Sequence, residues 1–163
     1  MTTTLVIGIG NYDRGDDGAG LAVAERIRAA HLPGVGIMQL DGDQLGLLDA
    51  WADAADVYVI DAVCSGCPPG TVFHFDAARA LPARFSYRGT HTFSLADVVE
   101  LARELGSLPP RLTGYGIEGS KFEIGTALSP EITGAVEAVA DRLLRELRQP
   151  SDLRGRGEPR DGG

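Results

Sequence analysis

Short apolar segments alternate along the chain with longer segments in which apolar residues recur every three or four positions. The short segments predict strands at 5–10, 35–40, 57–60, 71–75 and 112–117. The longer segments predict amphipathic helices at 17–30, 44–55, 94–105 and 129–147. Strands that alternate with helices are typical of α/β proteins with a mostly parallel sheet. We therefore expect a three-layer α/β/α sandwich around a five-stranded sheet.

The segment 71–75 breaks this alternation. It follows the strand at 57–60 after a short link that ends in the turn sequence Pro68-Pro69-Gly70. A parallel connection needs a crossover of a dozen or more residues, normally a helix, and the link has no room for one. This strand is therefore expected to pair antiparallel with a neighbour.

Two helix starts carry recognisable capping residues. Ser94 is followed three residues later by Asp97, in the spacing of a capping box. Ser129-Pro130-Glu131 supplies a cap, a proline favoured in the first turn and an acidic partner for the helix dipole.

Length and composition indicate a single domain. A chain of 163 residues that is 44% hydrophobic can form one sizeable core, and we assign it to residues 1–148. The remainder, 149–163, is polar and rich in glycine, proline and arginine, which predicts a disordered tail.

The charge balance excludes several classes of partner. The chain has 23 acidic and 15 basic residues and a net charge of −8, which argues against binding to nucleic acid or to anionic membranes. Its N-terminus lacks the features of a signal peptide, and its apolar runs are too short to span a bilayer. A cytoplasmic protein is expected.

Cys64 and Cys67 are the only cysteines, and in a reducing compartment they are not expected to form a structural disulfide. A redox pair or half of a zinc site remains open. Two observations argue against these functions. A redox pair normally lies at the start of a helix, but here Pro68-Pro69 follow the cysteines. A zinc site of four thiols would need a second pair of cysteines, which the chain lacks.

Acidic side chains follow the predicted strands, and a histidine precedes a predicted helix. These residues are Asp16, Asp17, Asp41, Asp43, Asp61, His91 and Glu118. Ligands of open α/β sheets bind at the carboxyl ends of the strands, so these side chains are expected at one edge. Carboxylates with an imidazole suit a divalent transition metal. Simpler roles stay open, because helix dipoles favour Asp16 and Asp17, and Asp61 can cap the turn at 65–66.

Other readings of the same region are weaker. The glycines of Gly8-Ile9-Gly10 resemble the start of a dinucleotide fingerprint, but position 13 is an aspartate instead of the third glycine. A sharp turn at Gly10 and Asn11 explains them better. His31 and His74 are assigned structural roles, and no nucleophile–histidine arrangement is evident.

Three segments, taken in order, resemble the hydrogenase maturation proteases, the HybD/HycI-type peptidases. They are Val6-Ile7-Gly8-Ile9-Gly10-Asn11 with Asp16-Asp17-Gly18-Ala19-Gly20, then Val59-Ile60-Asp61-Ala62, then His91-Thr92-Phe93-Ser94-Leu95. The resemblance spans residues 5 to about 147.

The resemblance implies a metal-dependent endopeptidase (a hydrolase) that removes a C-terminal extension from the large-subunit precursor of a nickel–iron hydrogenase. By position, Asp17, Asp61 and His91 would bind nickel that the substrate carries, so the free enzyme need hold no metal. Asp41-Gly42 resemble an aspartate–glycine pair that the family uses in substrate processing or recognition. Apart from the resemblance, Asp41 is our candidate general base, and Asp16, Gly42 and Glu118 are candidate substrate contacts.

This chain departs from the family pattern in two loops. Asp43-Gln44 replace a glycine–threonine pair, and Glu118-Gly119 replace a glutamine–proline pair. Both loops border the expected site, so they bear on the identity of the substrate. Two alternatives therefore stay open: a nickel-binding maturation factor without catalysis, and a peptidase of the same fold that cleaves another protein.

Overall fold

The structure is a computed structural model that describes residues 3–41, 45–76, 95–150 and 153–154. Its strands are β1 (Thr4–Ile9), β2 (Val35–Leu40), β3 (Asp56–Val63), β4 (Val72–Asp76) and β5 (Arg111–Glu118). Its helices are the 3-10 helix η1 (Tyr12–Gly18), α1 (Ala19–Ala29), α2 (Gly46–Ala50), α3 (Leu95–Leu105) and α4 (Pro130–Leu147).

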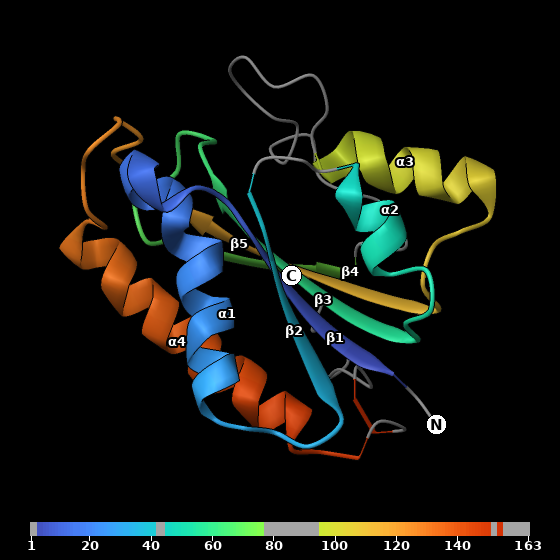
Figure 1. The fold of residues 1–163 in the computed structure, drawn as a ribbon. Helices are drawn as coiled ribbons and strands as arrows, with labels where there is room; N and C mark the ends of the chain where they lie inside the picture. Colours follow the sequence, from blue (N-terminus) through green and yellow to red (C-terminus); the bar gives the residue numbers. More distant parts are fainter. Residues whose placement is uncertain (1–2, 42–44, 77–94, 151–152, 155–163) are drawn as a thin grey trace, which may run out of the picture.

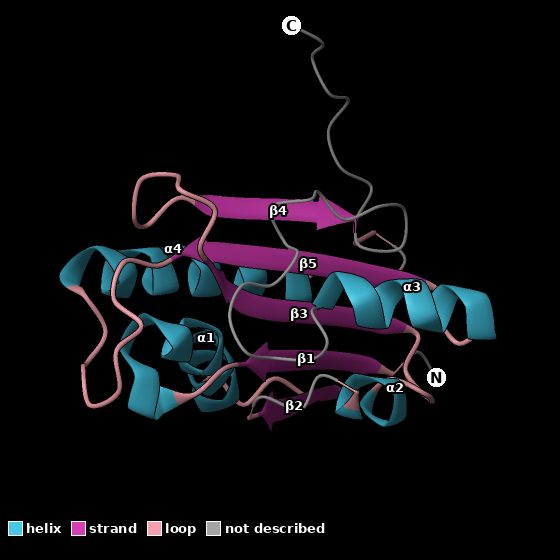
Figure 2. Ribbon diagram, turned by 90° about the horizontal axis from the view of Figure 1, so that it is seen from above, coloured by secondary structure: helices cyan, strands magenta, loops and turns pink. Residues whose placement is uncertain are grey.

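The five strands form one sheet in the order β2-β1-β3-β5-β4. The first four are parallel, and β4 runs antiparallel to β5. In Figure 1, α1 and α4 lie on one side of the sheet, and α2 and α3 lie on the other. Figure 2 shows the strands from above, with β2 and β4 at the two edges. The three-layer sandwich and the antiparallel strand are thus confirmed.

Each face of the sheet is buried in its own apolar core. Val6, Tyr58 and Ile117 point toward α1 and α4, where they pack with Val23 and Val136. The opposite face carries a second cluster that includes Ile7, Val59, Leu47, Trp51 and Val98. Alternate residues of each buried strand therefore serve opposite cores, which explains why the strands read as continuous apolar runs.

The boundaries of several elements differ from the predicted ones. Strand β3 continues past Asp61 to Val63, because its backbone stays paired with β5 as far as Glu118. The prediction that this strand ends at residue 60 was wrong, since ladder hydrogen bonds use the main chain whatever the side chain is. Helix α2 is shorter than predicted, and η1 precedes α1.

Ser129 occupies the N-cap position of α4, and Pro130 is in the first turn, as predicted. However, the Ser129 hydroxyl makes no capping hydrogen bond within the helix and donates to Asp16 instead. Ser94 of the predicted capping box lies outside the described residues.

Most of the predicted disordered tail, 149–163, lies outside the described residues, but Arg154 is held against the domain. Arg154 is buried and donates hydrogen bonds to the carbonyls of Leu147 and Gln149 and to the hydroxyl of Thr4. Its guanidinium also lies 3.5 Å from the buried carboxylate of Asp56. The burial of Asp56 supplies the reason, since a buried carboxylate needs cationic partners.

Within the described part of the chain, no helix has the length and apolar character needed to cross a membrane.

Candidate functional site

Close backbone packing brings the ends of β1 and β3 together with η1. A Cβ atom on Gly20 would overlap the carbonyl oxygen of Ile60 and lie 2.7 Å from that of Ile9. Gly10 has a φ of 148°, and a Cβ there would overlap the carbonyl oxygen of Asp17. These positions require glycine because the chain segments touch main chain to main chain.

Asp17 and Asp61 lie on segments that adjoin at this edge of the sheet. Asp17 is the penultimate residue of η1, which packs against β3, and Asp61 lies one residue after Ile60. Both are partly buried, and both make further interactions in the structure. The Asp61 carboxylate also accepts a hydrogen bond from the N–H of Ala62 at 2.8 Å. Both aspartates thus lie near the carboxyl ends of strands, and their role as metal ligands stays a prediction.

Asp16, the immediate neighbour of Asp17, is fully buried. Its carboxylate accepts hydrogen bonds of 2.8 Å from the N–H groups of Ser120, Lys121 and Ser129, and one of 3.0 Å from the Ser129 hydroxyl. Burial acts to raise the pKa of the Asp16 carboxyl. The N–H donors of Ser129, Lys121 and Ser120 outweigh it and hold the pKa below its usual value. Asp16 is thus a structural anchor in this geometry, which departs from the predicted substrate contact.

Glu118 has a similar anchoring position at the end of β5. Only 1% of its surface is exposed, and it accepts hydrogen bonds from the N–H groups of Ser65 and Gly66 and from the Ser65 hydroxyl. The carboxylate therefore holds the loop that follows β3. The geometry again assigns loop support, where the sequence predicted substrate binding.

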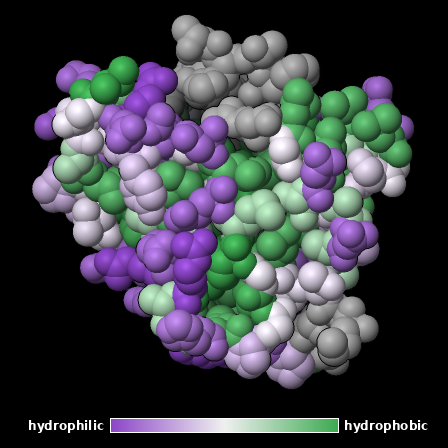
Figure 3. All heavy atoms as spheres, in the orientation of Figure 1, coloured by the Kyte–Doolittle hydropathy of each residue, from purple (hydrophilic) through white to green (hydrophobic). Residues whose placement is uncertain are grey.

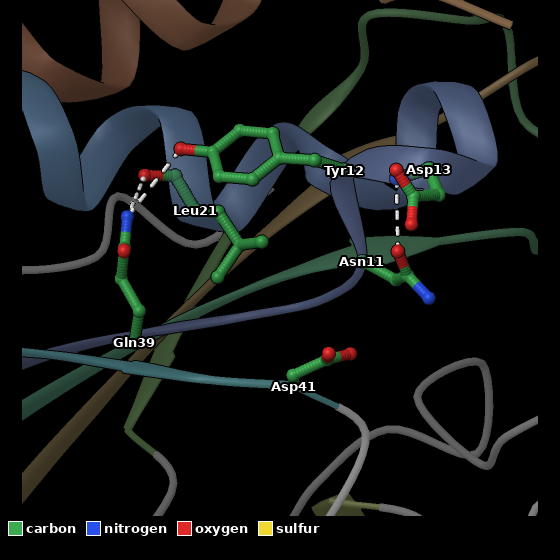
Figure 4. Close-up of a pocket in the computed structure, with 6 residues that line it drawn as sticks. All are labelled: Asn11, Tyr12, Asp13, Leu21, Gln39 and Asp41. Carbon is green, nitrogen blue, oxygen red and sulfur yellow. Dashed lines mark hydrogen bonds between the residues drawn. The ribbon is translucent and has the colours of Figure 1, made fainter. Parts of the chain in front are cut away.

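A pocket of about 320 Å³ opens beside this edge, at the ends of β1 and β2 (Figure 4). Its lining residues are Asn11, Tyr12, Asp13, Leu21, Gln39 and Asp41. Asp41 is exposed and is the first residue after β2. An exposed carboxylate that lines a pocket is able to accept a proton from a molecule bound there.

Tyr12 and Gln39 were missed by the sequence analysis. The Gln39 amide donates to the Leu21 carbonyl at 3.1 Å and to the Tyr12 hydroxyl at 3.4 Å, and so forms one wall of the pocket. The available signal was a polar residue at position 39 within an otherwise apolar strand, two residues before Asp41.

The remaining predicted site residues, His91 and Gly42, lie outside the described residues, as does Asp43. Among residues that the structure describes, no three histidine, cysteine or acidic side chains are grouped so as to hold a metal ion. The described part of the expected metal set is thus the carboxylate pair Asp17 and Asp61.

His74, assigned to structure, lies on the opposite side of the sheet from the second core. Its ring packs on Tyr115 at a centroid distance of 4.8 Å, and Nδ1 lies 3.1 Å from Nη2 of Arg142 on α4. Burial lowers the pKa of His74, and the neighbouring Arg142 charge lowers it further. Burial likewise raises the pKa of Tyr115 to about 12.

Comparisons with known proteins agree with this architecture. A sequence profile of the family described as hydrogenase maturation protease (HycI) matches residues 22–146. The chain belongs to the hydrogenase maturation protease family.

Individual relatives agree over nearly the whole chain. The hydrogenase expression/formation protein HupD of Rhodobacter capsulatus is 31% identical over 150 residues, which cover 88% of this chain and 70% of HupD. The hydrogenase 2 maturation protease of Escherichia coli is 28% identical, covering 89% of this chain and 90% of that protein.

Solved structures give the same result. The E. coli hydrogenase maturating endopeptidase HybD superposes with a TM-score of 0.75 at 27% identity, covering 90% of this chain and 93% of HybD. The hydrogenase 3 maturation protease, at 23% identity, supports the fold with a TM-score of 0.70.

In this chain the Glu118-Gly119 pair, a departure from the family pattern, has a local explanation. A Cβ on Gly119 would lie 2.5 Å from Cζ of Phe122 and 2.9 Å from Cβ of Asp16. The Gly119 N–H donates to the carbonyl of Val63 at 2.9 Å. The pair therefore lets β5 leave the sheet directly beneath η1, and Glu118 takes over the support of the loop at 65–66.

The two cysteines of this chain are free thiols, with Cys64 exposed and Cys67 partly exposed. They lie in the loop held by Glu118.

Proposed function

We propose that this chain is an endopeptidase that removes a C-terminal extension from the nickel-loaded large-subunit precursor of a nickel–iron hydrogenase. Its substrate would be recognised through the bound nickel by Asp17, Asp61 and His91. The observation that carries the proposal is the packing of η1 against β3, which brings the segments of Asp17 and Asp61 together at one sheet edge, beside a pocket that Asp41 helps to line.

Nickel recognition follows from the chemistry of these side chains. A divalent cation is attracted by two carboxylates that lie close enough to bind the same ion. A precursor without nickel lacks this attraction and should bind weakly. The metal belongs to the substrate in this scheme, and the imidazole of His91 is the borderline ligand that favours nickel over calcium or magnesium.

Hydrolysis is assigned to a water molecule activated by Asp41. The Asp41 carboxylate accepts a proton as the water oxygen bonds to the scissile carbonyl carbon. The carbon–nitrogen bond then breaks, and Asp41 returns the proton to the leaving nitrogen, which departs as an amine while the water oxygen stays on the new carboxyl group. The substrate's nickel, held by Asp17 and Asp61, fixes the precursor in register with this carboxylate.

The protein is expected to act in the cytoplasm on a folded protein partner, and not on nucleic acid or at a membrane. The net charge of −8 supports this part of the proposal, since it disfavours both polyanions and anionic lipid surfaces.

The test is the mass of the precursor after incubation with this protein, with and without nickel. The loss of a C-terminal peptide only from nickel-loaded precursor is expected. Asp17→Asn, Asp61→Asn and His91→Ala should each slow the cleavage by at least about 100-fold, as expected for loss of a metal ligand. Asp49→Asn, on the exposed surface of α2, removes one charge elsewhere and should cleave at the normal rate.

Two results would contradict the proposal. Complex formation without any change in precursor mass would indicate a nickel-binding maturation factor that does not cleave. The absence of both binding and cleavage would indicate a peptidase of this fold with another protein substrate.

A further inference from the structure

The outer edge of β2 leads directly into the candidate active site. β2 is an end strand of the sheet, and its last residue, Leu40, is followed by Asp41 at the pocket entrance. Gln39, the residue before it, forms a wall of the pocket. Any chain that paired along β2 would therefore pass Asp41.

The backbone groups that β2 presents on its outer side can be assigned from one hydrogen bond. The Gly10 N–H donates to the Leu40 carbonyl at 3.0 Å, so Leu40 faces β1. Backbone groups alternate sides along a strand, which turns those of Gly36 and Met38 inward and those of Val35, Ile37 and Gln39 outward. No hydrogen bond joins these outward groups to another backbone in the described part of the chain.

The residues of β2 do not prevent another strand from pairing with its outer edge. Its six residues, VGIMQL, include no charge and no proline, which are the usual means of protecting an edge strand. Figure 1 looks onto this edge, and Figure 3, in the same orientation, shows apolar side chains gathered at the centre of the face where β2 runs. Ile37, Met38 and Leu40 are all only partly buried.

We propose that the C-terminal extension of the precursor binds as an added sixth strand on the outer edge of β2, with its backbone paired to Ile37 and Gln39. This inference rests on the proposed function and specifies how the same site takes its substrate. Main-chain pairing gives affinity that is largely independent of the sequence of the extension. Six residues of β2 span about 20 Å, enough to fix the register of a peptide relative to Asp41.

A peptide fits this edge better than a second copy of the chain. Two copies that paired through β2 would place each strand across the other's pocket entrance, because Gln39 and Asp41 lie at that end of the strand. Such a dimer would close both sites, whereas a single extended peptide delivers its own backbone to Asp41.

Amide hydrogen exchange tests the proposal in the unmodified protein. Residue-resolved amide exchange is measured for the protein alone and for the protein with saturating nickel-loaded precursor. Both measurements are made at low temperature, where cleavage is slow. The Ile37 and Gln39 N–H groups are expected to exchange at least about tenfold more slowly in the complex, since each gains a backbone hydrogen bond. The outward N–H groups of Val72 and His74, at the opposite edge, should be unchanged.

A pair of proline variants gives an independent readout. Ile37→Pro removes an outward N–H without removing a donor to β1, and it should raise KM for the precursor about tenfold. Val72→Pro makes the same change at the outer edge of β4, where the N–H groups that face β5 belong to the alternate residues, and should leave KM unchanged. Thermal unfolding of both variants checks that the sheet is intact.

The outcomes separate this inference from the proposed function. Cleavage of the precursor with no added protection at Ile37 and Gln39 would overturn the added strand and leave the protease intact. Protection that appears on raising the protein concentration without precursor would show that a second copy occupies the edge, and would also overturn it. Protection by the precursor together with a selective rise in KM for Ile37→Pro supports it.

Discussion

The carboxylate of Asp16 binds both the N–H and the hydroxyl of Ser129, at 2.8 and 3.0 Å, and so joins η1 to the start of α4 across 113 positions of sequence. Two further N–H groups, those of Ser120 and Lys121, complete its hydrogen bonds. A buried charge satisfied in this way stabilises the fold only while it stays ionised.

Asp16→Asn should therefore lower the free energy of unfolding at pH 7 by about 2–4 kcal/mol, because the amide turns an N–H group toward backbone donors. The pKa of Asp16 is lowered in the folded protein, so its contribution is complete above the unfolded pKa of about 4 and is lost as pH falls through the folded value. The difference between wild type and variant should shrink toward acid pH.

Denaturant unfolding at a series of pH values measures this difference. Asp141→Asn, at an exposed position of α4, is the matched control and should change stability by less than about 0.5 kcal/mol. A difference between wild type and Asp16→Asn that stays constant down to pH 3 would contradict the assigned pKa direction.

Gly20 and Gly134 both lie inside helices but should respond in opposite ways to alanine. A Cβ on Gly20 overlaps the main chain of β3, whereas a Cβ on Gly134 meets nothing within 4 Å. Gly20→Ala should destabilise the protein by about 2–3 kcal/mol and reduce cleavage, because α1 must move away from the sheet and take η1 with it. Gly134→Ala should stabilise it by about 0.5–1 kcal/mol through helix propensity.

Thermal unfolding and precursor cleavage, measured side by side, test this pair. Equal stabilities for the two variants would mean that α1 does not depend on close contact with the end of β3.

Neutralising Glu118 should loosen the loop after β3. In Glu118→Gln, one carboxylate oxygen becomes an NH2 group that faces the N–H groups of Ser65 and Gly66. The amides of Ser65 and Gly66 should exchange at least about tenfold faster, for a loss of about 1–3 kcal/mol in local stability. Glu123→Gln, on an exposed loop, should leave both amides unchanged. Amide exchange that is the same in both variants would rule out the anchoring role.

The contrast between Asp16 and Asp17 shows which features of the site can be predicted from the sequence and which cannot. Strand ends and apolar periodicity were enough to predict the sheet, its antiparallel strand and the edge that carries the acidic residues. They could not assign adjacent aspartates to different roles, since the partners of Asp16 lie more than 100 residues away. The pocket wall was missed for a related reason: η1 has non-helical backbone at Arg14 and Gly15, so no periodic pattern places Tyr12.

The cysteine pair provides the last test, because a redox or zinc function would require both thiols. Cys64 and Cys67 are free, and the contacts that hold their loop come from Glu118 to Ser65 and Gly66 instead of from the sulfurs. The double variant Cys64→Ser/Cys67→Ser should therefore cleave the precursor at a rate within about twofold of wild type and unfold within about 0.5 kcal/mol of it. Wild-type activity should likewise be the same in reducing and mildly oxidising buffer. If the variant lost activity while keeping its stability, the thiols would belong to the functional site. The proposed nickel site of Asp17, Asp61 and His91 would then need a thiol ligand as well.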